Sequence, residues 1–269
     1  MQYVVLSASS LPHTDVGLVH RWLYEVVRIL HRDLSPKNIM YRRIDGKVYG
    51  VLNDFDLSSW TATLKTDYTR TSQQRTGTPP YMAAGLLKGI DTLHLYRHDV
   101  ESLFYIMLIL ATHYEIYIPE EEGQQGGLRM RQGLKTLPFE AWFDQPLYTT
   151  LGSVKNDFLA GSAPLDLSPT FEEFRDWIED LYRSFRRGFL SKRNYEEDLE
   201  DFRKGRGGRS GDELAPQFDD ETLGGRVSYS TLIDPARHLR GKLEGLIVRY
   251  ESQSASLNMA STGATQADT

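Results

Sequence analysis

Apolar side chains recur at helical spacing in three parts of the chain. The pattern predicts a helix over residues 15–30, for which Asp15 would serve as the N-cap. Residues 99–112 are apolar on every side, which is typical of a helix surrounded by other elements. A third stripe, at residues 171–185, places aromatic and aliphatic side chains on one face. Together these segments predict a mainly helical fold.

The pattern changes to short strands after the first predicted helix. Ile39 to Tyr41 and Val48 to Leu52 read as two strands, and Asp45-Gly46 between them is a strong signal for a tight hairpin turn. The polar segment that follows, residues 61–80, shows no periodicity. Loops of this length are usually functional or mobile. The sequence therefore predicts a hairpin followed by a functional loop.

The C-terminal third of the chain differs from the rest in composition. Residues 191–230 mix dense charge with glycine and few apolar side chains, so we expect a disordered insert after a folded region that covers residues 1–190. Residues 231–251 are predicted to form a last helix, and residues 252–269 a disordered tail.

Composition narrows the classes of function. The 269 residues carry a formal net charge of −6, which argues against nucleic acid as a partner because phosphate binding needs a basic surface. No cysteine is present, so disulfides, thiolate nucleophiles and cysteine-ligated zinc are excluded, and an intracellular setting (cytoplasm or nucleus) fits best. The most apolar run, residues 103–111, is shorter than the roughly 20 residues of a membrane span. We expect no membrane partner.

Two polar motifs flank the predicted hairpin. Residues 31–34 (HRDL) are followed by Asn38, and residues 54–56 (DFD) follow the second strand. This pair resembles the catalytic loop and the magnesium-binding turn of kinases, in which an Asp accepts the proton of the substrate hydroxyl while an Asn and a second Asp hold metal ions. Small-molecule phosphotransferases, such as aminoglycoside and choline phosphotransferases, share a similar pattern. The two motifs alone therefore leave the class of substrate open.

Two later segments favour a protein substrate. Residues 75–83 (RTGTPPYMA) resemble the peptide-docking end of a protein-kinase activation segment. Residues 94–105 (HLYRHDVESLFY) resemble the start of the central helix of that fold, in which an Asp, here Asp99, accepts hydrogen bonds from the catalytic-loop backbone. A buried carboxylate needs such partners, so this role is physically sensible.

From about Val16 to about Phe189, these segments together are similar to the fungal-type protein kinase family. The resemblance implies a mainly α fold: a protein-kinase-like C-terminal lobe with a short β-hairpin beside the catalytic loop. It also implies a partner or substrate that is a protein, with Mg and ATP as cofactors.

The resemblance assigns roles to individual residues. Asp33 would be the catalytic base, with Arg32 and Lys37 beside it, and Asn38 and Asp54 would hold Mg and the bound nucleotide. Two residues would have structural roles, namely His31 and Asp99. The activation segment would carry five hydroxyl side chains: Thr69, Thr71, Ser72, Thr76 and Thr78. Arg32 could bind a phosphate placed on one of the first four.

The sequence departs from the usual kinase pattern at three places. Ser35 replaces the lysine that many Ser/Thr kinases place two residues after the catalytic Asp, and it can donate a hydrogen bond to phosphate but brings no charge. Asp56 replaces the glycine of D-F-G, which stiffens that turn. Residues 83–85 (AAG) stand where A-P-E is usual, so we expect the activation segment to be loosely anchored.

The region before His31 is short. A kinase N-terminal lobe needs roughly 60 residues, and no G-x-G-x-x-G occurs before His31. We therefore expect this lobe to be absent and the surface that would contact it to be apolar and exposed. Two functions remain open: a Ser/Thr protein kinase represented by a partial chain that is inactive alone, and a non-catalytic kinase-like module that binds a partner. A small-molecule phosphotransferase is a third.

Overall fold

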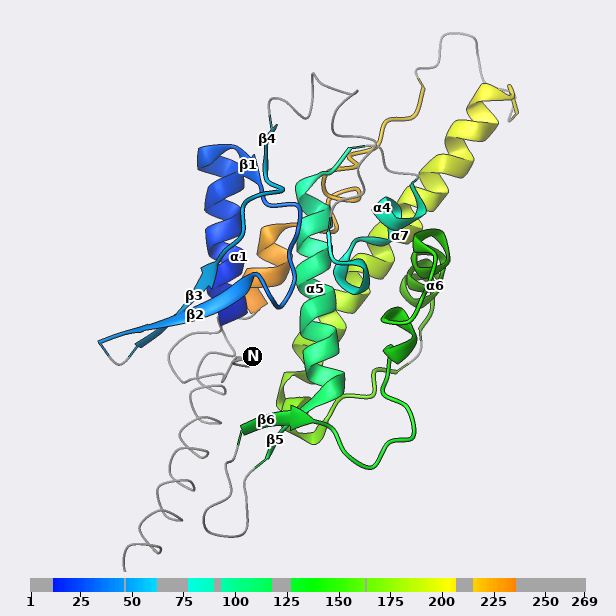
Figure 1. Ribbon diagram of the computed structural model, residues 1–269. Coiled ribbons are helices and arrows are strands. Elements are labelled where there is room, and N and C mark those ends of the chain that lie inside the picture. Colours follow the sequence, from blue (N-terminus) through cyan, green and yellow to red (C-terminus); the bar gives the residue numbers. More distant parts are fainter. Residues whose placement is uncertain are drawn as a thin grey trace, which may run out of the picture.

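A long central helix organises the molecule. The computed structural model describes residues 12–45, 47–61, 77–89, 93–117, 127–162, 164–206 and 215–235. Helix α5 (Tyr96–His113) runs through the middle, with α1 (Pro12–Trp22) on one side and α6 (Tyr148–Ala160) and α7 (Arg175–Arg203) on the other (Figure 1). The short helix α4 (Ala84–Lys88) packs against α6. The described chain is mainly helical, as the sequence predicts.

Helix α5 is buried almost from end to end, which explains why its sequence is apolar on every side. Phe104 stacks on Phe185 of α7 with ring centroids 5.0 Å apart. The helix begins at Tyr96, three residues before the predicted start. The reason is a cap, because the backbone N–H of Leu95 donates to Nδ1 of His98 at 2.9 Å.

Helix α1 also begins earlier than predicted. It begins at Pro12, and proline suits the first turn of a helix because its missing N–H would have no partner there. Asp15 therefore lies inside the helix, and its prediction as the N-cap is wrong. The helix passes into a π-helical turn, η1 (Leu23–Val27), which ends at Arg28 in a left-handed conformation with φ of 66°.

The strands of the described residues form three antiparallel pairs. Strands β2 (Ile39–Ile44) and β3 (Lys47–Leu52) pair in a register that sets Ile44 opposite Lys47, which confirms the predicted two-residue turn. The other pairs are β1 (Ile29–Leu30) with β4 (Ser59–Trp60), and β5 (Tyr114–Tyr117) with β6 (Gly127–Met130). Three short 3-10 helices complete the described elements: η2 (Pro79–Tyr81), η3 (Glu140–Trp142) and η4 (Pro169–Phe174).

The first part of the charged region after residue 190 is helical, although the sequence predicted it to be disordered. Residues 191–203 continue helix α7, where Arg193 and Glu197 form an i,i+4 ion pair at 3.1 Å on the exposed face. Such pairs stabilise a solvated helix although they bury nothing. Dense charge therefore reflects an exposed helical surface here, and the prediction was wrong for this part.

Residues 215–235 pack back onto the helices. Leu223 is fully buried and lies so close to Gly188 of α7 that a Cβ at that glycine would be 2.8 Å from Cβ of Leu223. The buried Arg97 donates from Nε to the carbonyl oxygen of Asp220 at 2.5 Å and also pairs with its carboxylate. Residues 215–235 contain few apolar side chains, but those few pack against helices of the main fold and become buried there.

Parts of the C-terminal predictions lie outside the described residues. Backbone from Tyr229 to Pro235 is helical, which overlaps the start of the helix predicted for residues 231–251. The remainder of that helix, the predicted tail (252–269) and most of the polar loop (62–76) fall outside the description. Across the described ranges, no helix is both long and apolar enough to cross a membrane.

Candidate active site

The catalytic loop is held from within by His31. This side chain is fully buried, and its Nε2 donates to the carbonyl oxygen of Asn53 at 2.8 Å. Its Nδ1 accepts the backbone N–H of Asp33 at 3.3 Å, which requires the neutral tautomer with the proton on Nε2. The ring also meets Phe55 edge-on, with centroids 4.9 Å apart. His31 thereby connects the catalytic loop to the turn that carries residues 54–56.

Asp99 of α5 fixes the backbone of the same loop. The backbone N–H of Arg32 donates to Oδ2 of Asp99 at 3.1 Å, the kind of bond expected for this residue. His20 and His94 each approach the carboxylate with Nε2 at 2.7 Å. Burial alone would raise the pKa of Asp99, but the charge of His94 and the hydrogen bonds from both imidazoles hold it well below its ordinary value. The hydrogen bond from its backbone N–H to Asp99 also holds Arg32 in a left-handed conformation with φ of 72°.

Sequence reasoning missed the two imidazoles. His20 comes from α1 and His94 precedes α5, and no ligand-like spacing links them in the sequence. The opposite nitrogen of His20, Nδ1, lies 2.6 Å from the hydroxyl of Tyr229, which is also buried. Three segments that are distant in sequence therefore meet behind the catalytic loop.

The proposed base, Asp33, is oriented by two side chains. Nδ2 of Asn38 donates to the carbonyl oxygen of Asp33 at 2.8 Å and to its Oδ2 at 3.2 Å. The hydroxyl of Thr78 donates to the other carboxylate oxygen, Oδ1, at 3.1 Å. The catalytic loop and the end of the activation segment thus meet at one carboxylate. Thr78 lies in the predicted activation segment, and nothing in the sequence indicates this bond.

The donor set suits Mg²⁺. Asp54 is exposed and adopts a left-handed conformation with φ of 62°, while Asn38 is 6% exposed and its amide nitrogen donates to Asp33. In the described ranges no cluster of three or more His, Cys, Asp or Glu could hold a metal. Mg²⁺ needs no such cluster, because it often takes one or two carboxylates together with phosphate and water. Asn38 and Asp54 therefore fit the ion by their chemistry.

The three polar residues next to Asp33 and Asn38 differ in exposure. Lys37 is exposed. Ser35 is only 1% exposed, so the hydroxyl of Ser35 does not face the side from which a phosphate would approach. Arg32 is only 8% exposed; its guanidinium donates to the hydroxyl of Ser59 at 2.7 Å, and burial lowers its pKa. Four of the predicted activation-segment hydroxyls lie outside the described residues: Thr69, Thr71, Ser72 and Thr76.

Apart from Tyr229, the residues that make these contacts lie within one segment that matches a family model. Residues 14–111 match the family model described as fungal protein kinase. Over this segment the chain is similar to the fungal protein kinase family. A comparison with curated proteins found no match. The matched segment contains the catalytic loop, the residue 54–56 turn, residues 78–84 and most of α5.

The end of the activation segment is anchored firmly, contrary to the prediction. We call residues 78–84 the docking segment. Nζ of Lys155, from α6, donates to the carbonyl oxygens of Pro80 and Met82, and the carboxylate of Glu101, from α5, accepts the N–H of Ala84. The missing A-P-E glutamate led to the wrong expectation because two other buried charges hold this backbone.

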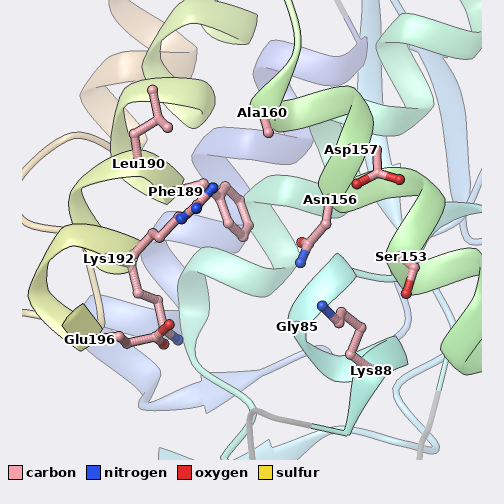
Figure 2. A pocket seen from close by; sticks show the side chains of 11 residues that line it. Gly85, Lys88, Ser153, Asn156, Asp157, Ala160, Phe189, Leu190, Lys192 and Glu196 are labelled. Carbon is pink, nitrogen blue, oxygen red and sulfur yellow. The ribbon is translucent and has the colours of Figure 1, made fainter. Parts of the chain in front are cut away.

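Exposed apolar side chains occupy the elements that flank the catalytic loop. Trp22 is 56% exposed and Val26 is 65% exposed at the end of α1 and in η1, and Phe55 is exposed beside His31. A cavity of about 380 Å³ lies elsewhere, between α4, α6 and α7 (Figure 2). It is lined in part by Gly85, Lys88 and Asn156. None of Asp33, Asn38 and Asp54 lines this cavity, so it is not the catalytic site.

Proposed function

We propose that the chain carries the phosphoryl-transfer centre of a protein kinase that moves the γ-phosphoryl group of ATP to a Ser or Thr hydroxyl. The observation that carries the proposal is the 3.1 Å hydrogen bond from Thr78 to Asp33. It links the carboxylate that would accept the hydroxyl proton to the segment that would dock a peptide. This link favours a protein substrate over a small molecule.

Each polar residue has a role in this proposal. Asp33, oriented by Asn38 and Thr78, would accept the proton of the attacking hydroxyl. Asn38 and Asp54 would hold Mg²⁺, which when bound neutralises charge on the transferred group. Lys37, exposed on the same loop, would face the phosphates in place of the lysine that Ser35 replaces.

A non-catalytic kinase-like module is the second candidate. The burial of Ser35 favours it, because that position then provides neither charge nor an accessible hydroxyl to a phosphate. The exposed Trp22 and Val26 would serve such a module as a contact surface for a protein partner.

An experiment separates the two candidates. In protein kinases a glycine-rich loop and a lysine hold the ATP phosphates, so both are supplied by fusing the N-terminal lobe of a fungal protein kinase ahead of residue 12. We expect the fusion to phosphorylate Ser/Thr peptides and Asp33→Asn to lower kcat by roughly 10²–10⁴-fold. A fusion that binds ATP but transfers no phosphate would favour the non-catalytic function, and an active fusion that Asp33→Asn does not slow would contradict the role of Asp33 as the base.

The 269-residue chain by itself provides a further test. We expect MgATP to raise its melting temperature no more than Mg²⁺ alone does, because Asp54 is exposed, Asn38 is largely buried, and neither lines an enclosing pocket. A true site at 100-fold excess over its Kd would add about 2.7 kcal/mol. A rise of several degrees that Asp54→Asn abolishes would contradict this expectation.

A further inference from the structure

Two charged side chains are fully buried behind the docking segment. Lys155 and Glu101 are both 0% exposed, although a charge without partners is strongly unfavourable in such a place. Nζ of Lys155 lies 2.8 Å from the carbonyl oxygen of Pro80 and 2.6 Å from that of Met82. The same nitrogen stands over the ring of Tyr105 at 4.0 Å. The lysine therefore exchanges water for two backbone acceptors and an aromatic face.

Glu101 completes the arrangement from α5. Its Oε1 accepts the backbone N–H of Ala84 at 2.8 Å and the hydroxyl of Tyr105 at 2.7 Å. Burial lowers the pKa of Lys155 well below its ordinary value and raises that of Glu101, and each charge partly offsets the burial of the other. Neither group contacts solvent, so neither is placed to act on a ligand directly. Their bonded partners include three backbone groups of one segment.

The packing of α6 makes this contact possible. Gly152 lies one turn before Lys155 and faces α4, where a Cβ would be 2.6 Å from Cγ and 2.9 Å from the backbone nitrogen of Lys88. Only glycine lets α6 approach α4 this closely. Gly85 stands at the place of the A-P-E glutamate and lines the cavity between α4, α6 and α7 (Figure 2). The docking segment is thus held from the inside of the fold and not by a side chain at position 85.

We infer that Lys155 and Glu101 are positioning residues that fix the docking segment and, through Thr78, orient Asp33. That this segment docks a peptide and that Asp33 acts as a base rest on the proposed function. That Lys155 and Glu101 fix its backbone rests on the contacts alone. Thr78 opens the segment that Lys155 and Glu101 hold at Pro80, Met82 and Ala84, so loss of the lysine should loosen both ends.

Hydrogen exchange of the 269-residue chain tests the inference without any need for activity. In Lys155→Met, we expect amides in residues 81–87 to exchange at least about tenfold faster, while residues 100–111 of α5 keep their protection. Lys135→Met, which removes an exposed lysine, is the charge-matched control and should change neither region. Unchanged exchange in residues 81–87, or an equal increase in both regions, would overturn the inference.

A second variant covers the case in which Lys155→Met does not fold. Lys155→Met with Glu101→Gln removes both buried charges, so it leaves no uncompensated ion. We expect it to fold and still to show faster exchange in residues 81–87, because the carbonyls of Pro80 and Met82 have lost their donor. Full protection in this variant would overturn the inference.

Kinetics of the fused enzyme separate this inference from the proposed function. Lys155→Met should raise KM for a peptide substrate at least about fivefold and leave KM for ATP unchanged, because both hydrogen bonds from Nζ of Lys155 go to the docking segment. Faster local exchange with an unchanged peptide KM would support the anchor and count against peptide docking by this segment.

Discussion

Two carboxylates near the start of α5 hold the two functional loops, and their surroundings are opposite. Asp99 accepts the backbone N–H of Arg32 in the catalytic loop, and Glu101 accepts that of Ala84 in the docking segment. Two imidazoles lower the pKa of Asp99, whereas burial raises the pKa of Glu101. One helix therefore positions both loops, but the carboxylate at the catalytic loop has its pKa lowered by its partners, whereas the one at the docking segment has its pKa raised by burial.

The largest expected effect comes from removing Asp99. Asp99→Ala leaves three buried donors without their acceptor, namely the N–H of Arg32 and the imidazoles of His20 and His94. Breaking a buried charged network typically costs about 3–5 kcal/mol. Asp33→Ala removes a half-buried carboxylate with two side-chain bonds, so we expect a loss of about 1 kcal/mol. Urea unfolding of both variants measures the difference.

Equal losses for the two variants would contradict the division into a structural and a catalytic carboxylate. An unchanged slope of the unfolding free energy against urea is the control, because a changed slope would mean that the folded or unfolded state had altered in extent.

The sequence supplied one half of this comparison. The role of Asp99 could be predicted because the residues around it resemble a known motif, and the hairpin could be predicted because Asp45-Gly46 has local turn chemistry. Lys155 could not, because a lone lysine in a helix is normally solvated and only the fold shows that its head group lies under the docking segment. Glu101 stood beside Asp99 in an apolar run, which was a usable signal.

Helix α7 continues to Arg203 through residues that were predicted to be disordered. Charge density alone cannot distinguish a solvated helix from a disordered segment, and the deciding contacts, such as that of Leu223 with Gly188, are distant in sequence. Local patterns therefore identified the elements with local causes, whereas the burial of isolated charges and the docking of residues 215–235 required the tertiary structure.

The catalytic loop and the docking segment should respond differently to a fall in pH. The pKa of Asp99 is depressed, so its stabilisation is complete above the ordinary value of 3.8 and is lost as pH falls through the folded value. The pKa of Glu101 is raised, so its contribution is present below 4.5 and is lost as pH rises through the folded value. Between pH 6 and the acid range, protection from hydrogen exchange should fall at residues 31–35 before it falls at residues 81–87.

The groups around each carboxylate set the controls. His20 and His94 face Asp99, and Arg97, Lys155 and Tyr105 act on Glu101. Asp99→Asn keeps an acceptor for Arg32 but does not titrate, so residues 31–35 should be less protected at pH 6 and lose nothing further in acid. Simultaneous loss at both loops in the unmodified chain would contradict the assigned difference.

The smallest expected effect on stability concerns the exposed apolar side chains beside the catalytic loop. Trp22 and Val26 are 56% and 65% exposed, so folding removes less than half of their surface from water. Replacing both with Gln should change the free energy of unfolding by no more than about 0.5 kcal/mol. The double replacement should also reduce self-association measured by sedimentation velocity, because exposed apolar surface favours contact between copies.

The matched control replaces Leu147 and Val154 of the α6 region, which are 61% and 36% exposed, and should leave the association state unchanged. A loss of 2 kcal/mol or more in the first variant would show that these side chains support the fold, and equal association in both variants would remove the distinction between this surface and the rest of the molecule.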